Sequence, residues 1–317
     1  MKARVKMRLA ILLASCAVLN SLAQESVAAT PISQDPICGF IAGPHYSCEA
    51  DQIKQGLSTD LFIGDTQVGK PVRLRFFVNQ KPKGFPVDGL QVEHEKFIHV
   101  IGVRDDLKQF FHVHPARVSP GMWEVTHTFT EGGNYKLWSD MKYRGIAYTF
   151  GHPLLTVSGT IGRTEKNHDF TNFQVVAGYQ VTLSHPEPLI AGKTNQLQFV
   201  IRDAAGSPIE TENFLGASMH LVIVSDDLSV YLHGHPESRS AGDRTIRFNQ
   251  IFAKPCACKL FAQFRPGNSE LLVNSAILAE FYVNVAASGS ASVDAVASEA
   301  AIGRSASGRE EHIPSAF

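Results

Sequence analysis

The chain has 317 residues, a formal net charge of −1 and 44% hydrophobic residues. Its length suits two domains of ordinary size, and its charge excludes a general electrostatic attraction to nucleic acid or anionic membranes. The sequence contains no Gly-x-Ser-x-Gly, phosphate-binding loop or His-Glu-x-x-His motif, so hydrolase, kinase and zinc-protease chemistry have no support. We therefore expect a protein that is not an enzyme.

Residues 1–23 have the features of a signal peptide. Four basic residues precede an apolar run from Leu9 to Leu19, and Ser21-Leu22-Ala23 fits a cleavage site. The run is too short for a membrane-spanning helix. We expect a periplasmic or secreted protein whose mature chain has lost four positive charges. An alternative is a lipid anchor on Cys16, because Leu13-Ala14-Ser15-Cys16 resembles a lipobox.

Four cysteines remain in the mature chain, an even number that favours disulfides in an exported protein. Cys38 and Cys48 enclose a short loop with Gly and Pro in a lead-in of residues 24–67, and we expect them to pair. Cys256 and Cys258 are two apart, so both point to one face of an extended strand. A thiolate metal site, a local disulfide and bridges to other cysteines all stay open for this pair, with disulfide chemistry favoured.

From residue 68 onward the sequence is typical of short β-strands. Val72, Leu74 and Phe76 alternate with arginines, as in a strand with one buried face. Turn-forming residues separate this strand from the next ones, which together complete a first unit over residues 68–158. The further strands are expected at residues 98–103, 109–114, 123–129, 135–138 and 154–157. Polar residues 159–173 are expected to link this unit to a second one.

The second unit, residues 174–285, repeats the first. FIHVIGVRDDLKQFFHVHP, starting at Phe97, corresponds to SMHLVIVSDDLSVYLHGHP, starting at Ser218, with the histidines 121 positions apart. Such self-similarity indicates two copies of one structural unit. The pattern predicts an all-β protein with two tandem antiparallel β-sandwich domains of immunoglobulin-like or cupredoxin-like shape. Residues 286–317, rich in Ala, Ser and Gly, are expected to form a disordered tail.

Three histidines in each copy are the candidate metal ligands. His112 and His114 are two apart on one strand, and His99 lies across from them if the turn centres near Asp106. The second copy supplies the equivalent set: His220, His233 and His235. Three neutral imidazoles suit copper or zinc and leave one coordination position open. Copper is preferred because imidazole sites bind Cu(II) more tightly than Zn(II).

Other candidates are set aside. Three histidines occur only in the first copy: His94, His127 and His152. Two methionines are interpreted as packing residues rather than Cu(I) ligands: Met122 and Met219. The segment His112-Val113-His114 and the upstream Gly43-Pro44-His45 look like fragments of copper–zinc superoxide dismutase. Their order is reversed relative to that enzyme, so we reject this interpretation.

The sequence MHLVIVSDDLSVYLHGHP, followed by a strand pair and KLFAQF, resembles exported bacterial YtkA-like and related β-sandwich domains. The resemblance covers most of residues 69–157 and 192–285. It implies a β-sandwich in an exported protein, often associated with metal handling, and it supplies no established reaction. In the first copy, Ile98 stands where the second has Met219, and Val113 where it has Gly234. The two sites would differ in metal preference if Met219 were a ligand.

Two hypotheses about function follow. The first is a periplasmic protein that buffers or delivers copper, with zinc as the alternative ion, through duplicated three-histidine sites. The second is an envelope binding or assembly module, in which the histidine units are structural and another envelope protein is the partner. A copper oxidoreductase has little support. Measuring the metal content of the mature chain separates the first two.

Overall fold

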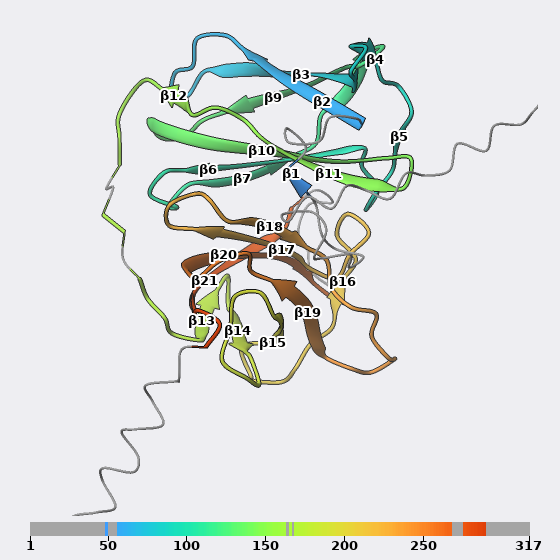
Figure 1. Cartoon of the computed structure of the whole chain (residues 1–317). Coiled ribbons are helices and arrows are strands. Elements are labelled where there is room, and N and C mark those ends of the chain that lie inside the picture. Colours follow the sequence, from blue (N-terminus) through green and yellow to red (C-terminus); the bar gives the residue numbers. More distant parts are fainter. Residues whose placement is uncertain (1–47, 50–55, 163–164, 167, 268–274, 290–317) are drawn as a thin grey trace, which may run out of the picture. The chain divides into compact units, whose positions relative to one another are not determined.

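The computed structural model describes residues 48–49, 56–162, 165–166, 168–267 and 275–289 (Figure 1). Several sequence-based expectations fall outside these residues and are not tested by the structure. They are the signal peptide, the lipobox at Cys16, the pairing of Cys38 with Cys48, and the disordered tail beyond residue 289.

The described residues form an all-β fold of 21 strands with no helix, which confirms the predicted fold class. Strands β1–β12 build the first sandwich and β13–β21 the second, coloured blue to green and yellow-green to red in Figure 1. Within the described ranges, no helix therefore has the length and hydrophobicity that a membrane crossing requires.

The first sandwich has one sheet of seven strands and one of five. The seven-stranded sheet has the order β1-β11-β10-β6-β7, with β5 and β12 also paired to β10. Its strands are β1 (Cys48–Glu49), β5 (Leu90–Gln91), β6 (Ile98–Arg104), β7 (Phe110–Val113), β10 (Gly133–Tyr143), β11 (Ile146–Gly151) and β12 (Leu155–Val157). The other sheet has the order β2-β3-β9-β8, with β4 on β3. Its strands are β2 (Gly56–Ile63), β3 (Pro71–Lys81), β4 (Phe85–Pro86), β8 (Ala116–Ser119) and β9 (Met122–Thr128).

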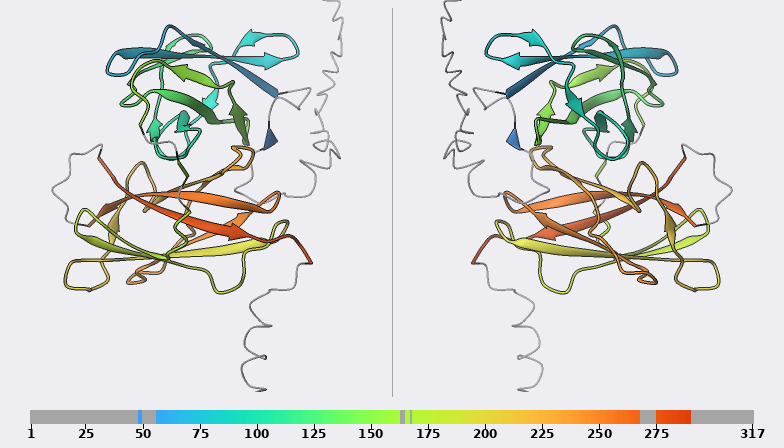
Figure 2. Two further views of the ribbon diagram at one scale, coloured as in Figure 1. Left: turned by 90° about the vertical axis from the view of Figure 1, so that its left-hand side faces the viewer. Right: turned by 90° about the vertical axis from the view of Figure 1, so that its right-hand side faces the viewer.

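The second sandwich has a four-stranded sheet, β13-β14-β15-β19, and a five-stranded sheet, β16-β20-β17-β18, with β21 on β20. The strands of the first are β13 (Phe173–Val176), β14 (Tyr179–Ser184), β15 (Thr194–Arg202) and β19 (Thr245–Ile251). Those of the second are β16 (Thr211–Glu212), β17 (His220–Ser225), β18 (Tyr231–Gly234), β20 (Cys256–Pro266) and β21 (Ile277–Val285). Figure 2 shows the two layers of this sandwich edge-on.

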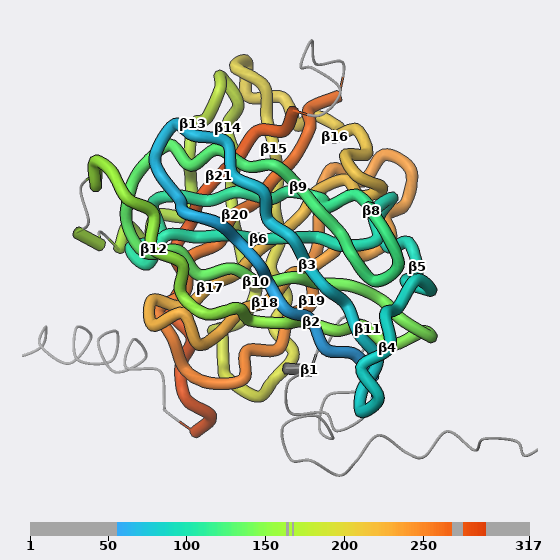
Figure 3. The backbone as a smooth tube through the Cα atoms, turned by 90° about the horizontal axis from the view of Figure 1, so that it is seen from above, coloured from blue at the N-terminus to red at the C-terminus, as the bar shows by residue number. Residues whose placement is uncertain are grey.

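Alternating side chains fill the space between the two sheets of each sandwich. Leu74, Phe76 and Val78 of β3 are fully buried in the first core, as the alternation predicts. In the second core, the equivalent positions of β15 are Leu197, Phe199 and Ile201. In Figure 3, β2 and β3 cross β6 and β10 at an angle. The equivalent strands β3 and β15 thus fill the same part of the core in the two copies.

The first sandwich begins earlier in the chain than the sequence predicted. β2 pairs antiparallel with β3 over its whole length and buries Leu57, although it lies within the expected lead-in of residues 24–67. β1, also in that lead-in, pairs with β11 in parallel rather than antiparallel. β2 interrupts its apolar positions with Ser58, Thr59 and Asp60, so its alternation is too weak to identify from sequence.

The hairpin of the repeated motif has the same turn in both copies. Asp106 accepts a hydrogen bond from the backbone N–H of Lys108, and Asp227 accepts one from that of Ser229. Asp106 also forms a buried ion pair with Arg104. These contacts identify Asp106 and Asp227 as equivalent turn-forming residues.

A third apolar cluster joins β6 and β10 of the first sandwich to β17 and β20 of the second. Its fully or nearly fully buried members are Ile101, Val103, Leu107, Trp138, Val222, Val224 and Phe261. Two stacked ring pairs flank it: Phe110 on Phe261 at 4.5 Å, and Trp138 on Tyr231 at 4.6 Å between centroids. Phe110 and Tyr231 are repeat equivalents, as are Trp138 and Phe261, so the two pairs are related by exchange of the copies.

Candidate metal centre

The three histidines of the first copy lie on one face of the β6–β7 hairpin. Ile101 pairs with His112 and Val100 with Val113, which places His99 next to His114 beyond the last paired residues. Val100 and Val113 pack in the core of their own sandwich. The alternating histidines therefore point out of that core, toward the apolar cluster shared with the second sandwich.

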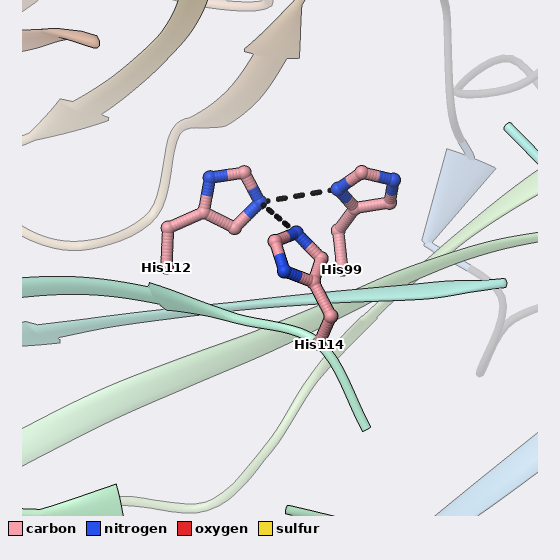
Figure 4. Close-up of side chains that lie close together, drawn as sticks. All are labelled: His99, His112 and His114. Atoms are coloured by element: carbon pink, nitrogen blue, oxygen red, sulfur yellow. Dashed lines mark hydrogen bonds between the residues drawn. The ribbon is translucent and has the colours of Figure 1, made fainter. Parts of the chain in front are cut away.

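The ring nitrogens of this first triad (His99, His112 and His114) converge. His112 Nε2 lies 3.1 Å from His99 Nδ1 and 3.2 Å from His114 Nε2 (Figure 4). Three nitrogens bound to one ion at 2.0–2.1 Å in tetrahedral geometry would be roughly 3.3–3.4 Å apart. These two spacings are close to those of a three-histidine metal site.

The outer hydrogen bonds of the first triad assign its tautomers. His99 Nε2–H donates to the carbonyl oxygen of Glu93 at 2.9 Å, and His112 Nδ1–H donates to Gln263 Oε1 at 2.8 Å. With those protons in place, the facing atoms His99 Nδ1 and His112 Nε2 both present lone pairs. Two facing lone pairs repel each other unless a cation lies between them, so this tautomer pair is suited to a metal ion.

The second triad (His220, His233 and His235) presents the same atoms. His220 Nε2–H donates to the carbonyl of Phe214 at 2.9 Å, and His233 Nδ1–H donates to Asp140 Oδ2 at 3.0 Å. The atoms left over are His220 Nδ1, His233 Nε2 and His235 Nε2, and all three are buried without a hydrogen-bond partner. In each triad, the candidate ligand atoms lie within 4.8 Å of one another.

Burial keeps these imidazoles uncharged. Removal from water lowers the pKa of every one of the six, to about 3 for His114 and to about 4 for His220. Neighbouring imidazoles reinforce the shift, since each would repel a second positive charge. At neutral pH the triads consequently hold the neutral form of histidine that binds metal ions.

Each triad is oriented by a residue of the other sandwich. Asp140 on β10 pairs with His99 in the sheet, yet its carboxylate accepts a hydrogen bond from His233. Gln263 on β20 pairs with His220, yet its amide oxygen accepts one from His112. Asp140 and Gln263 are repeat equivalents, so the two hydrogen bonds are reciprocal. Such outer-shell partners hold the ring and tautomer of a metal-binding histidine.

The carboxylate of Asp140 has two further donors, the hydroxyls of Tyr231 and Thr149, both at 2.6 Å. Burial raises the pKa of Asp140 and raises that of Tyr231 well above its usual value, so Tyr231 stays protonated as a donor. Gln263 lacks the tyrosine partner because Phe110 stands at the equivalent position. The second triad thus has a carboxylate–tyrosine support where the first has an amide and a phenylalanine.

His94 lies at the site although its absence from the second copy had set it aside. Its ring stacks on His235 at 3.6 Å between centroids and lies 5.9 Å from that of His220. Its repeat equivalent is Leu215, and both residues have positive φ, 48° and 51°. Their shared tight turn presents the carbonyls that orient His99 and His220. A polar cavity of about 390 Å³, lined in part by His94, Pro236 and Arg239, adjoins this edge of the second triad.

The other sequence candidates lie away from the triads. His127 stacks on Phe111, and His152 is buried with its ring nitrogen bonded to Ser139. Met219 is fully buried in the second core, and Met122 lies on β9 in the opposite sheet of the first sandwich. Cys256 and Cys258 form a disulfide with each other, which leaves no thiolate pair for a metal. Two expectations are thereby resolved: the methionines are not ligands, and the local disulfide is the correct alternative.

Sequence reasoning missed Asp140 and Gln263. The strand alignment that matches Lys136-Leu137-Trp138 with Lys259-Leu260-Phe261, extended by two residues, pairs them. Both copies have a polar residue at this position of an otherwise largely buried strand, and that pattern could have identified them.

The family model described as a domain of unknown function, DUF8832, matches residues 51–158 and 174–286. These matches cover more than half of the chain, so the protein belongs to this family and contains its domain twice. The first match begins upstream of β2, in agreement with the sandwich boundary. No curated protein matches the sequence.

Among solved structures, the chain is similar to three bacterial proteins at low identity. They are the adhesin InvE of Yersinia pseudotuberculosis (8% identity, TM-score 0.25, 72% of this chain and 60% of that chain), the integrin-binding protein invasin (13%, 0.23, 74% and 40%) and a DUF4785 family protein of Legionella pneumophila (10%, 0.25, 74% and 56%). The chain thus spans less than two thirds of each.

Proposed function

We propose that this protein binds metal ions through its two histidine triads and buffers or delivers the ion in the bacterial envelope, without catalysing a reaction. Copper is the proposed ion, with zinc as the alternative. Three imidazole nitrogens and an open fourth position suit either ion, and the order of affinities for nitrogen ligands favours Cu(II). The signal-peptide features and the resemblance to exported YtkA-like domains support an envelope location.

One observation carries this proposal. Three of the seven buried, unpartnered side-chain polar atoms found in the described residues are the three inward nitrogens of the second triad. A buried polar atom without a partner costs free energy, and three that converge on one point are not expected by chance. A bound cation would satisfy all of them at once.

Metal content of the purified mature chain, prepared without a histidine tag, tests the proposal. After incubation with Cu(II) or Zn(II) and removal of the excess, we expect two ions per chain by elemental analysis. His112→Ala and His233→Ala should each reduce this to one. The matched control is His185→Ala, which removes an exposed histidine outside the triads and should leave two.

A competition titration with both ions present identifies the preferred metal. Tighter binding of Zn(II) than of Cu(II) would replace copper by zinc in the proposal. A mature chain that folds and retains no stoichiometric ion would overturn metal binding. The histidines would then be structural, in a module that binds or assembles with another envelope protein.

A further inference from the structure

The two triads are as close to each other as the rings within each triad. Within the triads, centroid distances run from 4.6 Å (His112–His114) to 5.8 Å (His220–His233). Between the triads, His112 lies 5.2 Å and His99 5.4 Å from His233. The six rings therefore form one continuous cluster, rather than two sites at opposite ends of a duplicated fold.

The outer hydrogen bonds bind the two triads into one unit. His112 is held by Gln263 and His233 by Asp140, each across the boundary between the sandwiches. Neither sandwich alone contains both its middle histidine, His112 or His233, and the side chain that orients that ring. The complete site exists only where the two sandwiches meet.

Two cations bound in this cluster would repel each other, and nearby negative charge is needed to offset that repulsion. Two divalent ions in neighbouring buried triads repel with four times the energy of two monovalent ions at the same separation. The nearby carboxylate of Asp140 supplies one negative charge at most, and the six imidazoles supply none. A second anion close to both ions would offset the repulsion, and each ion has an open position for it.

We propose that the two triads form a single dinuclear metal centre, which holds one ion in each triad and takes one small anion, such as hydroxide, shared between the ions. This inference rests on the proposed function and adds that the two ions bind as a coupled pair. The ligand class is a small inorganic anion that fits between two adjacent metal ions.

Electron paramagnetic resonance of the mature chain with Cu(II) tests this arrangement. One equivalent of Cu(II) should give the signal of an isolated ion. Two equivalents should give less isolated-ion signal than one, because neighbouring Cu(II) ions that share an anion couple their spins. Cu(I) is counted separately with a colorimetric chelator, so that only Cu(II) is scored. In His233→Ala the signal should stay that of isolated Cu(II) at one ion per chain, and in His185→Ala the coupling should persist.

Azide serves as the probe for the shared anion. Added to the two-ion protein, it should change the spectrum with a stoichiometry of one azide per two Cu(II) ions, and His233→Ala should lose this behaviour. Two bound Cu(II) ions with two full isolated signals would overturn the dinuclear centre and leave metal binding intact. One ion per chain shared by all six histidines would also overturn it. Absence of any stoichiometric metal would instead overturn the proposed function.

Discussion

The first and second triads have the same backbone geometry and differ in the side chains that form hydrogen bonds to their histidines. In both, the same three ring nitrogens point inward and a carbonyl of a tight turn fixes the first histidine. The difference lies in the outer contacts, where the second triad has the carboxylate of Asp140 and the first has the amide of Gln263. The hairpin therefore sets where the histidines lie, and a side chain of the other copy orients the middle histidine of each triad.

The largest effect is expected from removing the rings that pack between the two sandwiches and hold the triads together. Phe261→Ala and Trp138→Ala remove equivalent buried rings that stack on Phe110 and Tyr231. Each should lower the free energy of unfolding by about 3–5 kcal/mol, because a large buried ring leaves a cavity. Chemical denaturation measures the loss. A cost below about 1 kcal/mol at either position would contradict a packed boundary between the sandwiches.

Acid should affect a residue that only the first sandwich carries. Burial lowers the pKa of His152 from 6.5 to about 4, so between these pH values the unfolded chain binds a proton that the folded chain does not. Above pH 6.5 the free energy of unfolding is unaffected by this proton. As the pH falls toward 4, protonation of the unfolded chain lowers the free energy of unfolding by roughly 3 kcal/mol. Denaturation of the metal-free protein across this range should show a shallower pH dependence in His152→Asn. Identical slopes would mean that His152 is not buried in neutral form.

The residues that orient the triads can be exchanged to sharpen the comparison. Asp140→Asn, in a His112→Ala background, should weaken binding at the second triad by about 10–100-fold, because the carboxylate no longer raises the basicity of His233. Gln263→Glu, in a His233→Ala background, should strengthen binding at the first triad. Competition with a chelator of known affinity measures both. Unchanged affinities would show that the hydrogen bonds to Asp140 and Gln263 do not influence metal binding by His233 and His112.

The smallest effect is expected from the tyrosine that supports Asp140. Tyr231→Phe copies the first sandwich, where Phe110 stands, and removes the hydroxyl that donates to Asp140 at 2.6 Å. One lost hydrogen bond to a charged group corresponds to about 1.5–3 kcal/mol, of which only a part reaches the metal. We expect a severalfold loss of affinity at the second triad, with unchanged stoichiometry. Phe110→Leu, measured in parallel, should leave the second triad unaffected.

The repeat made the fold and the two three-histidine clusters predictable from the sequence. Equal spacing of His99, His112 and His114 and their copies identified a hairpin with its histidines on one face, because alternation in a strand is a local property. The meeting of the two triads could not be predicted in this way. It depends on how two separate sheets pack, and no local pattern encodes that. His94 was missed for the same reason, since it reaches His235 across the same boundary.

The reciprocal contacts between the sandwiches resemble those of a symmetric dimer, although the two halves carry different residues. His112–Gln263 with His233–Asp140, and Phe110–Phe261 with Tyr231–Trp138, are the pairs that a twofold-symmetric homodimer of one sandwich would make. A homodimer must carry the same residue on both sides of its axis. Joining the copies in one polypeptide removes that constraint, so one side can hold an aspartate and the other a glutamine. The tandem chain thereby retains the geometry of a symmetric interface while the chemistry at its centre is free to be unequal.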